Sequence, residues 1–285
     1  MNNLRIGVPS KGRLSEIAAD LLKQAGLSFR RQDRSLFARV REIPVDITFL
    51  RTEDIPVLCA EGAIDLGITG SDLIVESGAG PQVSTRLKLG VGNCRLAICV
   101  PEASDIRELQ QLQGARVATT FPRTTRLHFE RHGVAVHLVN LSGSVEIMIA
   151  LGVADAIVDL VETGSTLAAN RLRVLDDIDH YETVLIQNTH GREASLADRV
   201  VRRLEGVVIA RSYSLLEYNL PRARLAEAEA ITPGFHSPTV NALEDPEWCA
   251  VRVMVPQKDT IRVMEQLEAL GASAILETQI NNCRL

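Results

Sequence analysis

The sequence predicts an α/β protein made of two similar lobes, followed by a smaller domain of a different α/β type. Two observations predict it. Short β-rich runs alternate with helical patterns from the start of the chain, and the same order of segments begins again near residue 115. Strands that alternate with helices form βαβ units with parallel sheets. The 285 residues correspond to roughly two average domains, and the 46% hydrophobic content suffices for packed cores.

The first lobe is predicted from segments of alternating type. Apolar residues recur at helical spacing before Gly26, a residue type that commonly ends helices. Short apolar runs on either side have the pattern of buried strands. The predicted elements are strands over residues 4–8, 45–50 and 64–68 and helices over residues 14–24 and 54–61.

A second lobe is predicted because this pattern repeats. Residues 115–119 form a predicted strand that ends just before Pro122 and a helix, much as the first strand ends at Pro9. The segment 152–158 echoes the segment 62–68: each has Gly, then Asp three residues later, then a β-rich run. Open α/β sheets bind ligands at the carboxyl ends of their strands. We therefore expect a substrate cleft between the two lobes.

The last part of the chain has a different order of elements. It reads βαββαβ, which is the ferredoxin-like split βαβ arrangement. Small domains of this type, when attached to enzymes, frequently bind regulatory ligands, which is an analogy and not a property of the fold. The predicted strands cover residues 213–219, 239–243, 250–255 and 274–279, and the predicted helices cover residues 221–229 and 259–270.

Composition argues against several classes of protein. The net charge of −5 and the lack of a long Lys/Arg run disfavour a nucleic-acid or anionic-membrane surface. No secretory signal or membrane-spanning run is recognised, so a cytoplasmic protein is expected. The five cysteines are scattered, which disfavours a disulfide framework or a zinc site. His128 and His132 have zinc-like spacing but lack a third ligand, so ordinary surface or packing residues are favoured.

The strongest signal of chemistry is the segment 155–167. Asp155 and Asp159 lie four residues apart on a predicted strand, and a turn rich in glycine and hydroxyl groups follows at the start of a helix. Backbone N–H groups and small hydroxyls at such a turn suit a phosphate. An acidic residue beside it suits a ribose diol or magnesium. The segment therefore predicts a site for a phosphorylated sugar, although a helix cap beside a solvated strand end would look the same.

This segment resembles the loop of phosphoribosyltransferases that binds phosphoribosyl pyrophosphate (PRPP). Residues 8–14, 65–72 and 92–96 resemble, in this order, segments of the ATP phosphoribosyltransferase family. Residues 231–239 and 269–276 resemble the regulatory domain of the long form of that family, and the resemblance covers nearly the whole chain.

The resemblance implies a two-lobed, periplasmic-binding-protein-like (type II) fold and a set of site residues. Asp155 and Asp159 would be catalytic. PRPP would be bound by Asp155, Ala156, Asp159, Thr163, Gly164, Ser165 and Thr166. ATP would be bound by Lys11, Arg13, Arg51, Asp72 and Arg95. Taken alone, Lys11 and Arg13 could lie on a solvated helix start, Arg51 could pair with Glu53 or Asp54, and Asp72 could cap a helix.

The resemblance also implies domain boundaries and regulation. Residues 1–96 and 179–211 would form lobe I on the ATP side, residues 97–178 lobe II on the PRPP side, and residues 212–285 a regulatory domain. Feedback inhibition by histidine and a homo-oligomer, a hexamer built of dimers, are implied. The histidine pocket would contain Glu217, Phe235, Ser237, Thr239 and Ala272. The turn at residues 237–239 could otherwise be merely rigid.

The implied reaction transfers phosphoribosyl from PRPP to N1 of the adenine of ATP and releases pyrophosphate, as the first step of histidine biosynthesis. Magnesium is the implied cofactor, on the leaving group, and no metal cage of protein side chains is expected. The leading alternative is a non-catalytic, two-lobed small-molecule binding protein. A phosphoribosyltransferase for a free base would share the PRPP loop but not the other segments.

Overall fold

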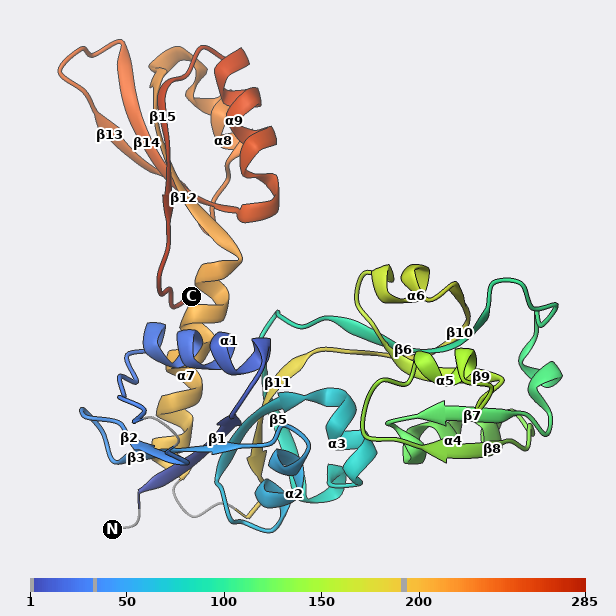
Figure 1. The fold of residues 1–285 in the computed structure, drawn as a ribbon. Coiled ribbons are helices and arrows are strands. Elements are labelled where there is room, and N and C mark those ends of the chain that lie inside the picture. Colours follow the sequence, from blue (N-terminus) through green and yellow to red (C-terminus); the bar gives the residue numbers. More distant parts are fainter. Residues whose placement is uncertain (1–2, 33–34, 191–193) are drawn as a thin grey trace. The chain divides into compact units, whose positions relative to one another are not determined.

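The computed structural model describes residues 3–32, 35–190 and 194–285. By its contacts the chain divides into two compact units, Met1–Ala19 with Ser28–Asp198, and Asp20–Leu27 with Arg199–Leu285. The first unit holds two sheets and the second holds one (Figure 1). None of the helices formed by the described residues is both long enough and apolar enough to cross a membrane.

The first sheet defines lobe I and has the strand order β2-β3-β1-β4-β11-β5. β1 pairs in parallel with β3 and β4, whereas β11 is antiparallel to β4 and β5. Its strands are β1 (Leu4–Pro9), β2 (Phe37–Arg39), β3 (Val45–Leu50), β4 (Leu66–Gly70), β5 (Val83–Lys88) and β11 (Thr183–Asn188). The helices between them are α1 (Arg13–Gln24), α2 (Asp54–Ala60) and α3 (Ser71–Ser77).

The second sheet defines lobe II and has the order β10-β6-β9-β7-β8, with β7 parallel to β8 and β9. Its strands are β6 (Cys94–Pro101), β7 (Arg116–Thr119), β8 (His137–Asn140), β9 (Ala156–Val161) and β10 (Leu172–Tyr181), and its helices are α4 (Pro122–Arg131), α5 (Ile147–Ala150) and α6 (Ser165–Ala169). The predicted lobe boundaries, after residue 96 and before residue 179, fall inside β6 and β10, because each strand belongs to this sheet over its whole length.

The two lobes repeat one strand order, which confirms the predicted repeat and the periplasmic-binding-protein-like fold. In each lobe the second, first and third parallel strands are neighbours: β3-β1-β4 in lobe I and β8-β7-β9 in lobe II. In each lobe, the strand that enters from the other lobe lies next to the third parallel strand. β11 lies between β4 and β5, and β6 lies between β9 and β10.

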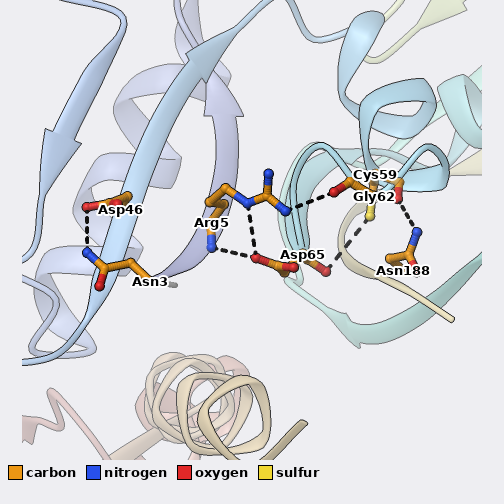
Figure 2. A network of polar contacts seen from close by, with 7 residues as sticks. All are labelled: Asn3, Arg5, Asp46, Cys59, Gly62, Asp65 and Asn188. Carbon is orange, nitrogen blue, oxygen red and sulfur yellow. Dashed lines mark hydrogen bonds and ion pairs between the residues drawn. The ribbon is translucent and has the colours of Figure 1, made fainter. Parts of the chain in front are cut away.

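The start of the third parallel strand of lobe I is held by the contacts that Figure 2 shows. The Asp65 carboxylate, just before β4, accepts the backbone N–H of Arg5 at 2.8 Å, and the Arg5 guanidinium donates to the Gly62 carbonyl at 2.8 Å. Asn188 donates to the Cys59 carbonyl at 2.6 Å on the same side. An acidic residue three positions after a glycine therefore ties the turn before β4 to β1.

The same arrangement recurs in lobe II. The Asp155 carboxylate, just before β9, accepts the backbone N–H of Arg116 at 2.9 Å, and the Arg116 guanidinium donates to the Gly152 carbonyl at 2.8 Å. The sequence echo between residues 62–68 and 152–158 therefore has a structural cause. Both copies brace the amino end of a parallel strand.

The second unit contains an antiparallel sheet with the order β13-β14-β12-β15, which confirms the predicted ferredoxin-like domain. Leu216 and Tyr218 of β12 pack against Val263 and Leu267 of α9, so the helices cover one face of the sheet (Figure 1). The elements are β12 (Tyr213–Pro221), α8 (Leu225–Ile231), β13 (Thr239–Ala242), β14 (Trp248–Pro256), α9 (Thr260–Ala269) and β15 (Ser273–Gln279). The domain was predicted to begin at residue 212, after α7 (Ala194–Arg211), but the contacts of this unit already include α7 from residue 199.

Candidate active site

Three of the predicted ATP-binding residues follow neighbouring parallel strands of lobe I. Lys11 follows β1, Arg51 follows β3 and Asp72 follows β4, so all three lie at the carboxyl edge of the sheet. The backbone N–H of Ser10 donates to the Leu50 carbonyl at 2.7 Å and joins the first two of these loops. In sheets of this kind, ligands bind at this edge.

Lys11 and Arg51 are exposed. Within the described part of the chain neither forms an ion pair, and Arg51 does not pair with Glu53 or Asp54 as the alternative would require. Their charges are therefore available for phosphate oxygens, which Arg and Lys bind well.

Asp72 differs from these cations because it is buried, with 6% of its surface exposed. Burial raises the pKa of its carboxyl, and hydrogen bonds from the backbone N–H groups of Asp72 and Leu73 oppose that rise. A Cβ atom on Gly70 would collide with the Asp72 carboxylate, so the close approach needs glycine. Asp72 therefore lies in the first turn of α3, whose N-cap is Gly70, and at the strand edge.

The loop of lobe II follows β9 and opens α6. Asp159 lies on β9 with an intermediate exposure, and burial raises the pKa of its carboxyl. Gly164 has a φ of 79°, in the left-handed region that glycine adopts at little cost. The Thr163 and Ser165 hydroxyls lie 3.1 Å apart, and both residues are exposed, as is Thr166. The loop thus presents hydroxyls and backbone N–H groups, and Asp159 lies on β9 four residues before Thr163.

Asp155 and Ala156 are not brought to this loop. They lie at the amino end of β9, and six strand residues at about 3.3 Å each separate Asp155 from the loop by roughly 20 Å. Asp155 instead forms an ion pair with Arg116 at 2.8 Å, and hydrogen bonds from that side chain hold the pKa of its carboxyl below its usual range. Ala156 is fully buried. The position of Asp155 therefore supports a structural role and corrects its predicted place beside the loop.

Arg13, predicted on the ATP side, connects the two lobes. Its guanidinium lies 3.1 Å from the carboxylate of Glu162, the residue just before Thr163 in the lobe II loop. Residues 149 positions apart in the sequence meet here. Sequence reasoning missed Glu162, because nothing in its spacing indicates a partner in the other lobe.

A cavity of about 520 Å³ lies where the chain crosses between the lobes. Arg95 and Glu162 both line it, which places a predicted ATP-side residue beside the lobe II loop. Arg95 donates to Asp177 at 2.8 Å. Burial raises the pKa of Tyr181, another lining residue, to about 12, so its hydroxyl stays protonated at neutral pH. Lys88 and Glu182, which pair at 2.6 Å, also line the cavity and were not predicted.

The predicted histidine-binding residues are only partly gathered. Glu217 lies opposite Arg252 on the neighbouring strand and bonds it at 2.6 Å, and Thr239 lies opposite Arg252 on the other side. Phe235 instead packs on Tyr213, with ring centroids 5.2 Å apart, and lines a separate cavity of about 290 Å³. Ser237 is exposed on the loop between them, and Ala272 packs against the core under the helices.

Within residues 3–32, 35–190 and 194–285, no group of three or more His, Cys, Asp or Glu side chains is placed to hold a metal ion.

Comparison with known proteins decides the family. Residues 51–206 match the family described as "HisG: ATP phosphoribosyltransferase", and residues 210–282 match "HisG, C-terminal domain". The chain belongs to the ATP phosphoribosyltransferase family. A relative with that name in Rhodopirellula baltica is 65% identical over 99% of this chain and 94% of its own length. One in Corynebacterium kroppenstedtii is 39% identical over 99% of both chains.

A solved structure agrees with the family. A chain of the ATP phosphoribosyl transferase (HisG:HisZ) complex from Thermotoga maritima matches with a TM-score of 0.64 and 29% identity, over 72% of this chain and 98% of that one. Membership confirms the resemblance found in the sequence, including the C-terminal domain of the long form. It also confirms the predicted enzyme class, a transferase, over the non-catalytic binding protein.

Proposed function

We propose that this chain transfers the phosphoribosyl group of PRPP to N1 of the adenine of ATP and releases pyrophosphate, in the first step of histidine biosynthesis. One observation carries the proposal. The cationic loops of lobe I and the hydroxyl-rich loop of lobe II both follow parallel strands at the carboxyl edge, and Arg13 and Glu162 join them at 3.1 Å. Two polyanionic substrates held at facing edges would meet between the lobes.

Lobe II is proposed to hold PRPP. Thr163, Gly164, Ser165 and Thr166 would bind the 5-phosphate through hydroxyls and backbone N–H groups. Asp159, two residues before the end of β9, would face the ribose. As the bond from the anomeric carbon to pyrophosphate breaks and the bond to N1 forms, positive charge develops on the ribose. A fixed carboxylate stabilises that charge.

Lobe I and the first residues of β6 are proposed to hold ATP. Lys11, Arg13 and Arg51 carry positive charge toward the triphosphate, and the planar guanidinium groups suit bidentate phosphate contacts. Arg95 lines the cavity next to the lobe II loop. Asp72 would bound the same side at the start of α3. The proposed domain roles are those of the sequence analysis, with residues 212–285 as the regulatory part.

Magnesium is proposed to accompany the diphosphate of PRPP. The described residues offer Asp159 and the loop hydroxyls but no cluster of three potential ligands, and magnesium typically binds through one or two carboxylates together with substrate phosphates. These residues therefore fit an ion carried by the substrate. When bound, it neutralises charge on the departing pyrophosphate.

Regulation by histidine is proposed to reside in the C-terminal domain, with the chain in a cytoplasmic homo-oligomer, a hexamer. Glu217, bonded to Arg252, would bind the amino group of histidine, and Ser237 with Thr239 its carboxylate. If histidine binds away from the cleft, its inhibition would act by favouring one of two global arrangements.

The matched pair Asp159→Asn and Asp155→Asn tests the proposal. Turnover of ATP and PRPP is followed by the near-ultraviolet absorbance of the N1-substituted product. Asp159→Asn is expected to lower kcat/KM for PRPP by about 100-fold or more, as loss of one group that stabilises a transition state does. Asp155→Asn is expected to keep the value of the parent within a few-fold. Normal turnover by Asp159→Asn, or loss of turnover by a folded Asp155→Asn, would reject the proposed site.

A further inference from the structure

The C-terminal end of helix α3, which belongs to lobe I, is bonded to lobe II. The Glu76 carboxylate accepts the backbone N–H of Arg123 at 2.8 Å, and the backbone N–H and hydroxyl of Thr124 at 2.9 and 2.8 Å. Leu73, one turn earlier, packs against the buried core of lobe II. We call these contacts the α3–α4 clasp.

The sequence at the start of α4 explains why the clasp forms. The first N–H groups of a helix have no partner inside it and are usually bonded by a Ser, Thr, Asp or Asn just before the helix. Here that position is Phe121, which has no acceptor, and Pro122 has no N–H to satisfy. Arg123 and Thr124 remain as donors, and a carboxylate near a helix N-terminus is favourable. Glu76 supplies the missing acceptor from the other lobe.

A second contact acts in the opposite direction. Gly78 ends α3 with a φ of 73°, and a Cβ atom there would lie 3.2 Å from the guanidinium carbon of Arg123. The Arg123 side chain therefore lies over the end of α3, where a cation is favourable beside the last carbonyl groups. The anionic Glu76 thus lies at the N-terminus of α4, and the cationic Arg123 lies at the C-terminus of α3.

The other end of α3 is tied to the return connection between the lobes. The backbone N–H of Ser71 donates to the Glu182 carbonyl at 2.9 Å, and the backbone N–H of Glu182 donates to the Ser71 hydroxyl at 3.1 Å. Asp72 lies in this first turn. Helix α3 is about 10 Å long. It therefore extends from the connection between the lobes, where Asp72 lies, to the edge of lobe II.

This placement gives the clasp a consequence for the reaction. α4 follows β7, and β7 is the parallel neighbour of β9, which leads into the proposed PRPP loop. Holding α3 against α4 therefore fixes the distance between Asp72 and that loop. The Arg13–Glu162 contact spans the same gap with side chains that are 66% and 47% exposed, and such exposed pairs contribute little. Glu76 makes three hydrogen bonds from a half-buried position.

We propose that Glu76 is a positioning residue for phosphoribosyl transfer: through the start of α4 it holds the ATP side of lobe I at the separation from the PRPP loop that the reaction needs. Glu76 touches neither substrate in this account, which rests on the proposed function. A displacement of about 1 Å between reacting groups can lower a rate about 100-fold. Loss of the clasp therefore slows the transfer step more than it weakens binding of PRPP, whose proposed residues all lie in lobe II.

The test compares Glu76→Ala and Glu76→Gln in the full-length protein with Glu61→Gln, an exposed glutamate at the end of α2. Glu76→Ala is expected to lower kcat by roughly 10- to 100-fold while PRPP affinity, measured alone by calorimetry, changes by less than about threefold. Glu76→Gln keeps one carbonyl oxygen as acceptor and is expected to fall between Ala and the parent. Glu61→Gln is expected to match the parent.

Two results would overturn the proposal while leaving the proposed function intact. The first is a kcat of Glu76→Ala within about twofold of that of Glu61→Gln. The second is a fall of both the melting temperature and the PRPP affinity in both Glu76 variants, because such a fall indicates that a lobe has lost its fold. A parent protein without turnover would instead overturn the proposed function, and the positioning role with it.

Discussion

Asp155 and Asp159 lie four residues apart in one segment, but their surroundings differ. Asp155 has a side chain 43% exposed and an arginine partner that lowers the pKa of its carboxyl. Asp159 is partly buried, and burial raises the pKa of its carboxyl. A solvated carboxylate paired with arginine is typical of a structural ion pair, whereas a carboxylate whose pKa is perturbed by burial is a candidate for a functional site. The two residues therefore call for different experiments.

Asp155→Asn is expected to lower the free energy of unfolding at pH 7 by about 1 kcal/mol, a value kept small because the ion pair is exposed. The folded-state pKa of Asp155 is depressed, so its contribution is present above the unfolded-state pKa of about 3.9 and is lost as the pH falls through the folded-state value. Urea unfolding of parent and variant at pH 7 and near pH 3 checks this. A difference in stability that does not shrink in acid would contradict the brace.

Asp72→Asn is expected to separate stability from activity. Burial raises the pKa of Asp72, so its charge opposes folding above the unfolded-state pKa, and that penalty fades as the pH falls through the raised value. Removing the charge should leave the melting temperature at pH 7 equal to or higher than that of the parent. The value of kcat/KM for ATP should fall by about tenfold or more, and a tenfold fall corresponds to about 1.4 kcal/mol of transition-state stabilisation. Thermal unfolding and steady-state kinetics, measured on the same samples, test both expectations. An unchanged kcat/KM for ATP would contradict the proposed role of Asp72 in binding ATP.

The loop between β9 and α6 is the element proposed to bind PRPP through its backbone. Gly164→Ala places a side chain at a φ of 79°, which costs about 1–2 kcal/mol. Gly133→Ala is a matched control, because Gly133 has a φ of 68°, follows the C-cap of α4 and, like Gly164, has open space where a Cβ would lie. Both variants should lose similar stability, but only Gly164→Ala should raise KM for PRPP. An equal rise in both variants would mean that backbone strain acts through stability alone.

Elements with a regular apolar pattern could be predicted from the sequence, and those without one could not. β1, α1, β3 and α9 have such patterns and were predicted within a few residues. β10 contains Asp176, Asp177 and Asp179, and its register shifts twice, so neither hydrophobicity nor alternation marks it as a strand. Glu76 and Glu162 were missed for a related reason: their partners lie 47 and 149 residues away, and spacing carries no information about them.

On the scale of the whole molecule, the duplicated Gly-x-x-Asp segments allowed two lobes to be predicted, because both copies perform the same bracing task. Asp155 was assigned to the site because it lies four residues before Asp159 in the segment that precedes the loop. An aspartate that braces a strand and an aspartate beside a phosphate loop are the same residue type in the sequence. Only the direction of β9 shows that Asp155 lies at the end of the strand opposite to the loop.

Regulation belongs to this scale too. Glu217→Gln is expected to weaken histidine inhibition by about tenfold or more, because a charged hydrogen bond to the amino group is lost. Its kcat without histidine should equal that of the parent. Glu244→Gln, an exposed glutamate of the same domain, is the control. Inhibition curves for the three proteins check the assignment, and equal sensitivity of Glu217→Gln and parent would remove Glu217 from the pocket.

The most direct measurement mixes the full-length protein with PRPP, magnesium and either ATP or free adenine, and follows the near-ultraviolet absorbance and the release of pyrophosphate. The account predicts steady turnover with ATP, little with adenine, and a lower rate when histidine is added. Equal rates with adenine would point to a free-base transferase. No turnover with ATP, by protein that still binds PRPP, would contradict the account.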